Sequence, residues 1–104
     1  MDEQPPALEV DVRYDRDGTP HMALEGELDI ASLARLRRLF LAALGDRRRM
    51  VLDLRRLRFV DLPGVRLLAE LSTLCELEVA GATGQVARLL DLLRVGSAAP
   101  AAAA

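Results

Sequence analysis

The feature that most constrains this chain is the alternation of two hydrophobic periods along its length. Apolar residues at every second position predict strands, and apolar residues three or four positions apart predict helices. The strand pattern occurs twice at the start, and helix and strand patterns then alternate to the end. The expected order of strand, strand, helix, strand, helix, strand and helix is typical of an α/β domain. Its sheet should be mixed: antiparallel at an opening hairpin and parallel through right-handed crossovers.

Each expected segment follows from a short pattern. Leu8, Val10 and Val12 alternate with charged residues in the first strand, and Asp17-Gly18 supplies a hairpin turn. Further strands are expected at residues 22–26, 50–54 and 76–80, with helices at 30–44, 65–75 and 86–93. The run at 50–54 is almost continuously apolar, which favours a central strand covered on both faces. Residues 57–64 are interpreted as a loop that enters the second helix.

A chain of 104 residues has room for one domain. We expect a polar leader at residues 1–7, a folded domain at 8–96 and a disordered Ala-rich tail at 97–104, where no side chain is larger than proline. With 51% hydrophobic and 29% charged residues, the composition favours a soluble globular fold. The longest apolar stretch, residues 39–45, is far shorter than the roughly 20 residues of a membrane span. We therefore expect no membrane insertion and a cytoplasmic location.

Charge is distributed unevenly along the chain. Residues 1–34 carry nine acidic residues against two arginines, whereas residues 35–66 carry ten arginines against three acidic residues. This asymmetry predicts a basic side and an acidic side. The arginines are dispersed, and Tyr14, Phe40 and Phe59 form no evident platform for base stacking, so no nucleic acid is expected as a ligand. A solvated face or a patch for an acidic protein partner fits better.

Catalytic patterns are nearly absent. The sequence has no phosphate-binding GxxxxGK loop, no GxSxG and no HExxH. His21 lies in the hairpin without a visible partner and is interpreted as structural or solvated. Cys75, the only cysteine, lies on an apolar helix face and is interpreted as a core residue. We therefore predict a non-enzymatic protein with no cofactor and no metal site.

Two carboxylates are better placed than the others. Asp29 follows the second strand and Asp61 follows the central strand, each at the start of a helix. The ends of parallel strands meet at one edge of a sheet, where α/β folds place their ligand sites. The two residues are interpreted as helix N-caps, as parts of a functional surface, or as both.

Three blocks of the sequence together resemble one known family. Residues 24–29, Leu-Glu-Gly-Glu-Leu-Asp, resemble the G-E-L-D motif of STAS domains, the sulfate transporter and anti-sigma factor antagonist family. Residues 50–54 followed by 57–65 resemble its second block, a strand that ends in DL and then F-x-D-S-S-G at a helix start. Residues 86–96 are similar to its third block, an amphipathic helix that ends near a glycine.

This resemblance implies a small mixed sheet with three to four helices mainly on one face. It also implies a regulatory module, a monomer or weak dimer, that binds an anti-sigma factor with a kinase-type ATPase fold. The resemblance further implies a regulatory switch, in which the kinase-type partner phosphorylates the second serine of D-S-S-G and the complex then dissociates. The partner-binding residues that the resemblance assigns are Asp29, Asp61, Leu62, Pro63, Gly64 and Arg66.

The sequence departs from the family at the switch. The two serine positions are Leu62 and Pro63, and proline has no hydroxyl to phosphorylate. Partner binding without phosphorylation at this loop is therefore expected. Two alternatives remain open at this stage: a structural STAS-like subunit of a sensory complex or of a lipid transport ATPase, and a small-ligand-binding module.

Overall fold

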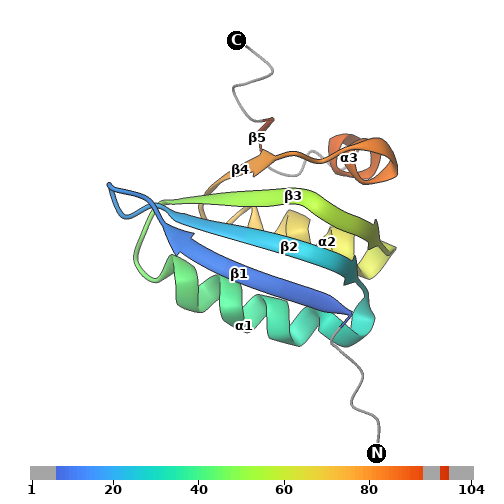
Figure 1. Cartoon of the computed structure of the whole chain (residues 1–104), viewed down its shortest axis with the longest axis horizontal. Coiled ribbons are helices and arrows are strands. Elements are labelled where there is room, and N and C mark those ends of the chain that lie inside the picture. Colours follow the sequence, from blue (N-terminus) through green and yellow to red (C-terminus); the bar gives the residue numbers. More distant parts are fainter. Residues whose placement is uncertain (1–6, 93–96, 99–104) are drawn as a thin grey trace, which may run out of the picture.

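The computed structural model describes residues 7–92 and 97–98 and shows one sheet with helices packed against it (Figure 1). The strands lie in the order β1-β2-β3-β4-β5, with β1 and β2 antiparallel and the other neighbours parallel. The elements are β1 (Leu8–Tyr14), β2 (Pro20–Leu28), the 3₁₀ turn η1 (Ile30–Ser32), α1 (Leu33–Leu44), β3 (Arg49–Val60), α2 (Leu62–Leu71), β4 (Glu76–Ala80), α3 (Gly84–Leu92) and β5 (Ser97–Ala98). The predicted α/β class and mixed sheet are confirmed.

The opening hairpin turns at the predicted Asp-Gly pair. Gly18 has φ 82°, a left-handed conformation that glycine adopts without strain, and its N–H donates to the Asp15 carbonyl oxygen at 3.0 Å. The Asp15 carboxylate accepts the backbone N–H groups of Asp17 and Thr19 and also contacts His21 Nε2 at 2.9 Å. His21 therefore has a partner that the sequence analysis did not find, because β1 and β2 bring residues 15 and 21 together.

The core lies between the sheet and its helices. From β2 to β3 and from β3 to β4 the chain crosses to the neighbouring strand on the same side. Because such crossovers are right-handed, the helices that connect these strands lie on the same face of the sheet. Figure 1 shows α1 and α2 against this face. Val86 and Leu90 of α3 join the same apolar cluster. The largest fully buried side chains include Phe40 of α1 and Met50 and Leu52 of β3, and each such burial contributes roughly 1.5–3 kcal/mol.

Strand β3 is longer than the sequence predicted. It continues to Val60, and α2 already begins at Leu62, so of residues 57–64, which were interpreted as a loop, only Asp61 lies between the strand and the helix. The alternation is interrupted where Arg55 and Arg56 are both exposed, because the β2–β3 register shifts between residues 23 and 25 of β2 and again between 26 and 27. Because of these irregularities the side chains of Leu57 and Val60 again face the core, and both are buried.

The predicted separation into an acidic and a basic side does not hold on the open face of the sheet. Parallel pairing places acidic β2 beside arginine-rich β3, and Glu25 forms an ion pair with Arg56 at 3.6 Å. Arg49 and Glu78 are joined in the same way across β3 and β4. Adjacent strands therefore mix charges that are separated along the sequence.

The end of the domain also differs from the prediction. Ser97 and Ala98 form β5 and pair with Glu78 and Val79 of β4, so the predicted boundary at residue 96 falls short by at least these two residues. Strand pairing uses backbone groups, so small side chains do not prevent it. The rest of the predicted tail, residues 99–104, and the predicted stop at Gly96 lie outside the described residues, as does most of the leader. No helix within the described ranges is long and apolar enough to cross a membrane.

Candidate functional site

The carboxyl ends of β2 and β3 lie side by side, with Leu28 opposite Val60. The chain leaves each strand through an aspartate that caps the following helical segment. Asp29 Oδ1 accepts the backbone N–H of Ala31 at 3.1 Å, and Asp61 Oδ1 accepts that of Gly64 at 2.8 Å. Both N-cap interpretations are confirmed, and each cap stabilises its helix by about 1 kcal/mol.

Asp61 also joins the two loops to each other. Its second carboxylate oxygen, Oδ2, accepts the backbone N–H of Ile30 at 3.2 Å, and its own N–H donates to the Leu28 carbonyl oxygen at 3.2 Å. One side chain therefore fixes the start of α2 and the loop after β2 in a single unit. We call residues 29–33 and 61–66 the carboxyl-end rim.

Apolar side chains are exposed on the carboxyl-end rim. Leu62, the first residue of α2, is 53% exposed, and Ile30 of η1 is 72% exposed. Ile30 N–H bonds the Asp61 carboxylate and Leu62 directly follows Asp61, so both residues lie on the carboxyl-end rim. Apolar side chains exposed together mark an interaction site more often than scattered single ones do. The prediction that Leu62 lies at the surface is confirmed, although it is already helical.

The remaining rim residues explain how α2 is seated. Gly64 is buried, and a Cβ atom there would lie 2.8 Å from Val60 Cγ2 and 3.0 Å from the Leu28 carbonyl oxygen. Only glycine lets the first turn of α2 come this close to the ends of β2 and β3. Pro63 lies in that first turn, where its missing N–H costs nothing. Arg66 is exposed one turn after Leu62 on the same side of the helix, and no carboxylate among residues 7–92 forms an ion pair with it.

Two surface residues near this edge were not among the predicted site residues. Ile30 was interpreted as the start of the helix that follows Asp29, within the predicted binding rim at residues 29–33, and Phe59 as part of a loop and of the F-x-D motif. Phe59 is 45% exposed and lies opposite Glu27, while its neighbour Val60 faces the core. Two consecutive apolar residues in a strand face opposite sides of the sheet. The adjacent apolar residues Phe59 and Val60 could therefore have indicated, from the sequence, that one of the two side chains is exposed.

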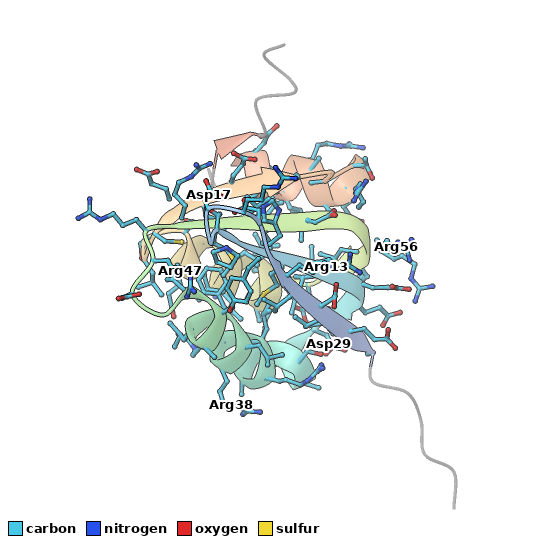
Figure 2. All side chains as sticks on the ribbon, turned by 60° about the vertical axis from the view of Figure 1, so that its left-hand side comes forward. Arg13, Asp17, Asp29, Arg38, Arg47 and Arg56 are labelled. Carbon is cyan, nitrogen blue, oxygen red and sulfur yellow. The ribbon has the colours of Figure 1, made fainter. Side chains whose placement is uncertain are left out.

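The other reactive groups lie away from the carboxyl-end rim. Figure 2 shows Asp17 of the hairpin and Asp29 of the rim at separate places on the molecule, and His21 belongs with the hairpin through Asp15. Burial, together with the negative charge of Glu76, raises the pKa of the Cys75 thiol, which disfavours the nucleophilic thiolate. In the described part of the chain no group of three or more potential ligand side chains could hold a metal ion.

The open face of the sheet has a broad hollow of about 620 Å³ lined mainly by charged residues of β1, β2 and β3. Arg13 and Arg56 both border it. Its charges are largely paired within the sheet: Arg13 with Asp11, Arg55 with Asp53 and Arg56 with Glu25. The Arg55 guanidinium holds the pKa of Asp53 below its usual range. The hollow therefore offers few unpaired charges to a ligand.

Comparison with known proteins agrees with this architecture. A family model described as "Mlab, STAS domain" matches residues 12–98. The chain belongs to the STAS domain family. A search of curated protein sequences gave no match.

Solved structures support the STAS fold. The domain is similar to an anti-sigma factor antagonist from Mycobacterium paratuberculosis, with 24% identity, a TM-score of 0.75, and coverage of 93% of this chain and 89% of that one. It is also similar to an antisigma-factor antagonist STAS domain from Rhodobacter sphaeroides, with 23% identity, a TM-score of 0.60 and coverage of 72% and 87%. The anti-sigma factor antagonist SpoIIAA in its unphosphorylated form gives 20% identity, a TM-score of 0.63 and coverage of 88% of each chain. The predicted family and fold are both confirmed.

Proposed function

We propose that this STAS domain is a non-enzymatic regulatory module that binds a protein partner through the carboxyl-end rim. The observation that carries the proposal is the joint exposure of Ile30 and Leu62 on loops that Asp61 holds together. A rigid apolar surface loses little conformational entropy on binding, so it suits a protein contact. The partner that the family fold favours is a cytoplasmic anti-sigma factor with a kinase-type ATPase fold, because structural relatives are described as anti-sigma factor antagonists.

The rim lacks the acceptor for the usual regulatory phosphate. Pro63 occupies the position of the serine that the family phosphorylates, and the next hydroxyls along the chain lie just beyond the other end of α2. Ser72 Oγ donates to the Ala69 carbonyl oxygen at 2.6 Å, and Thr73 Oγ1 donates to that of Glu70 at 2.7 Å. We propose that binding at the rim is not switched by phosphorylation at this loop.

A second candidate function uses the same surface in a different assembly. The domain would then be a structural subunit of a sensory complex or of a lipid transport ATPase, stabilising its partner without releasing it. The Leu62-Pro63 pair favours this alternative, because a rim without a phosphorylatable hydroxyl at this position suits permanent contact. Small-ligand binding is less well supported. The N–H groups of Ile30, Ala31 and Gly64, which could hold an anion, are already bound by aspartate oxygens.

The test is affinity capture with the full chain from source cells, followed by titration of the purified captured protein. Leu62→Asp should weaken binding by about 30-fold, since central apolar contacts commonly contribute about 2 kcal/mol. The midpoint of thermal unfolding should stay unchanged, because the residue is exposed and an acidic side chain is favourable at a helix start. A kinase-type ATPase as the captured protein supports the first function, and a transporter ATPase supports the second.

Leu41→Asp is the matched control. Leu41 is an exposed leucine on α1, 45% accessible, and lies outside the carboxyl-end rim. The Leu41→Asp variant should bind the captured protein with the same affinity as the wild type. Equal affinities of the wild type and Leu62→Asp for the captured partner would overturn the proposed surface.

A further inference from the structure

The outer edge of the sheet at β1 has the features of a strand that pairs with another strand. Within residues 7–92 and 97–98 only β2 pairs with β1, which lies at the border of the sheet (Figure 1). All seven β1–β2 residue pairs are in regular register, in contrast to the irregular β2–β3 pairing. Natural edge strands are protected by proline, a bulge or charged side chains, lysine above all; β1 has no proline, bulge or lysine, and its three charged residues are of both signs, which can pair with a second strand.

Two hydrogen bonds show which backbone groups of β1 face outward. Glu27 N–H donates to the Ala7 carbonyl oxygen at 2.8 Å, and Asp15 N–H donates to that of Thr19 at 3.1 Å. Residues 7 and 15 are both odd, and hydrogen-bonded positions alternate along an antiparallel pair. The odd-numbered residues therefore bond to β2, and the even-numbered residues direct their N–H and C=O groups away from the sheet.

One of these outward groups is already occupied. Arg35 of α1 reaches the edge and donates from Nη1 to the Leu8 carbonyl oxygen at 2.7 Å. Val10, Val12 and Tyr14 keep outward backbone groups without such a bond among the described residues. The usable edge is therefore the second half of β1.

We propose that this edge pairs with the same edge of a second copy of the chain, antiparallel and with Val12 opposite Val12. Three symmetric arrangements place outward-facing residues opposite one another and overlap at least five residues of β1; they are centred on residue 10, 11 or 12. The arrangement centred on residue 10 puts Glu9 opposite Asp11, and the one centred on residue 11 puts Asp11 opposite itself, so both bring like charges together. Both also need the Leu8 carbonyl oxygen as an acceptor, and Arg35 already donates to it. Centring on 12 leaves that carbonyl free of the contact.

The chosen arrangement also matches the charges. Asp11 then faces Arg13 of the second copy, and Arg13 faces Asp11, on the open side of the sheet. Within one copy these side chains already form an ion pair at 3.1 Å, and both are largely exposed, at 65% and 84%. In the dimer they would form an alternating cluster of four charges. Directly opposed unlike charges stabilise strand pairing, and like charges weaken it.

Apolar contacts and backbone bonds complete the interface. Val12 meets its own copy and Val10 meets Tyr14 on the helix side, while about six backbone hydrogen bonds join the strands. At the ends, Glu9 falls opposite Asp15, whose carboxylate is held within its own hairpin by Thr19 N–H and His21. The contact is small, so the dimer should be weak and concentration-dependent. It uses no residue of the carboxyl-end rim and is independent of the proposed function.

The first test is sedimentation equilibrium of the full chain from micromolar to millimolar concentration. The wild type should pass from monomer to dimer. Arg13→Asp and Asp11→Arg should each raise the dissociation constant about tenfold, because two attractive pairs become repulsive. The double variant Asp11→Arg/Arg13→Asp should restore it to within about threefold of the wild type. Arg88→Asp, at an exposed position of α3, changes the net charge as Arg13→Asp does and should leave the dimer unchanged.

The second test removes one outward N–H. Val12→Pro deletes a donor that β2 does not use, and proline is tolerated on edge strands, so the monomer should fold while the dimer is lost. In the wild type, exchange of the Val12 amide should slow as concentration rises. A chain that stays monomeric throughout, a dimer that Val12→Pro leaves intact, or a double charge variant that fails to regain pairing would overturn the proposal.

Discussion

Asp61 Oδ2 accepts the backbone N–H of Ile30 at 3.2 Å across a sequence separation of 31 residues. The same carboxylate caps α2 through Gly64 N–H, so a single side chain links the ends of two parallel strands to two helix starts. This relationship turns two loops that could move separately into one surface. It also makes the geometry of the carboxyl-end rim sensitive to one residue.

Replacing Asp61 should therefore reduce both stability and order at the rim. Asp61→Ala loses the cap and the bond to Ile30, and we expect the free energy of unfolding to fall by about 2 kcal/mol in urea denaturation. Asp61→Asn keeps one acceptor for Gly64 N–H and should lose only about 1 kcal/mol. In both variants the Ile30 amide should exchange faster. An unchanged Ile30 exchange rate would show that the bond does not order this loop.

Gly64 should be intolerant of even the smallest side chain. In Gly64→Ala the added Cβ would lie 2.8 Å from Val60 Cγ2 and 3.0 Å from the Leu28 carbonyl oxygen, and we expect a loss of about 1–3 kcal/mol in the free energy of unfolding. Gly18→Ala is the comparison. Its Cβ has open space, so only the backbone strain at φ 82° should appear, about 1–2 kcal/mol. Partner binding should fall in Gly64→Ala alone, because only that change moves the start of α2.

The hairpin carboxylate of Asp15 should give the chain a dependence on acidic pH. The Asp17 side chain, His21 and the backbone N–H groups of Thr19 and Asp17 hold the pKa of Asp15 well below its usual range. The unfolded chain then binds the proton more readily than the folded chain. The stabilisation is present above the unfolded pKa of about 4 and is lost as pH falls below it.

Asp15→Asn measures this contribution. The variant should be less stable than the wild type near neutral pH, and the difference should shrink as pH is lowered below about 4 in urea titrations. Asp46→Asn, which removes an exposed carboxylate on the connection before β3, is the control and should leave the stability near neutral pH unchanged. A constant difference between the wild type and Asp15→Asn from neutral to strongly acidic pH would contradict the low pKa of Asp15.

Restoring a hydroxyl at the helix start tests the interpretation of the rim as an unswitched surface. With a purified kinase-type partner and ATP, the wild type should remain unlabelled at residues 61–66 and Pro63→Ser should take up phosphate. A helix N-terminus favours the anion locally by about 0.3–1 kcal/mol, so the fold should tolerate it. Affinity should then fall on labelling, because the added charge lies at the contact. Labelling of the wild type at the rim would contradict this account.

The sequence determined the order of the elements and the two capped helix starts, because these depend on local physical chemistry. Period-two alternation marked β1, helical spacing marked α1, and an aspartate followed by proline and glycine marked the start of α2. Three blocks, at residues 24–29, 50–65 and 86–96, together identified the STAS family, because they occur in order and at the family's spacing along the chain.

The tertiary structure decided what depends on strand pairing. Register shifts between β2 and β3 carry β3 on to Val60, and backbone pairing brings Ser97 and Ala98 into the sheet. The bond from Ile30 to Asp61 and the contact from His21 to Asp15 join residues that no local pattern relates. Backbone hydrogen bonds and the close approach of strand ends are set by the whole sheet, and residue types alone do not record which strand lies beside which.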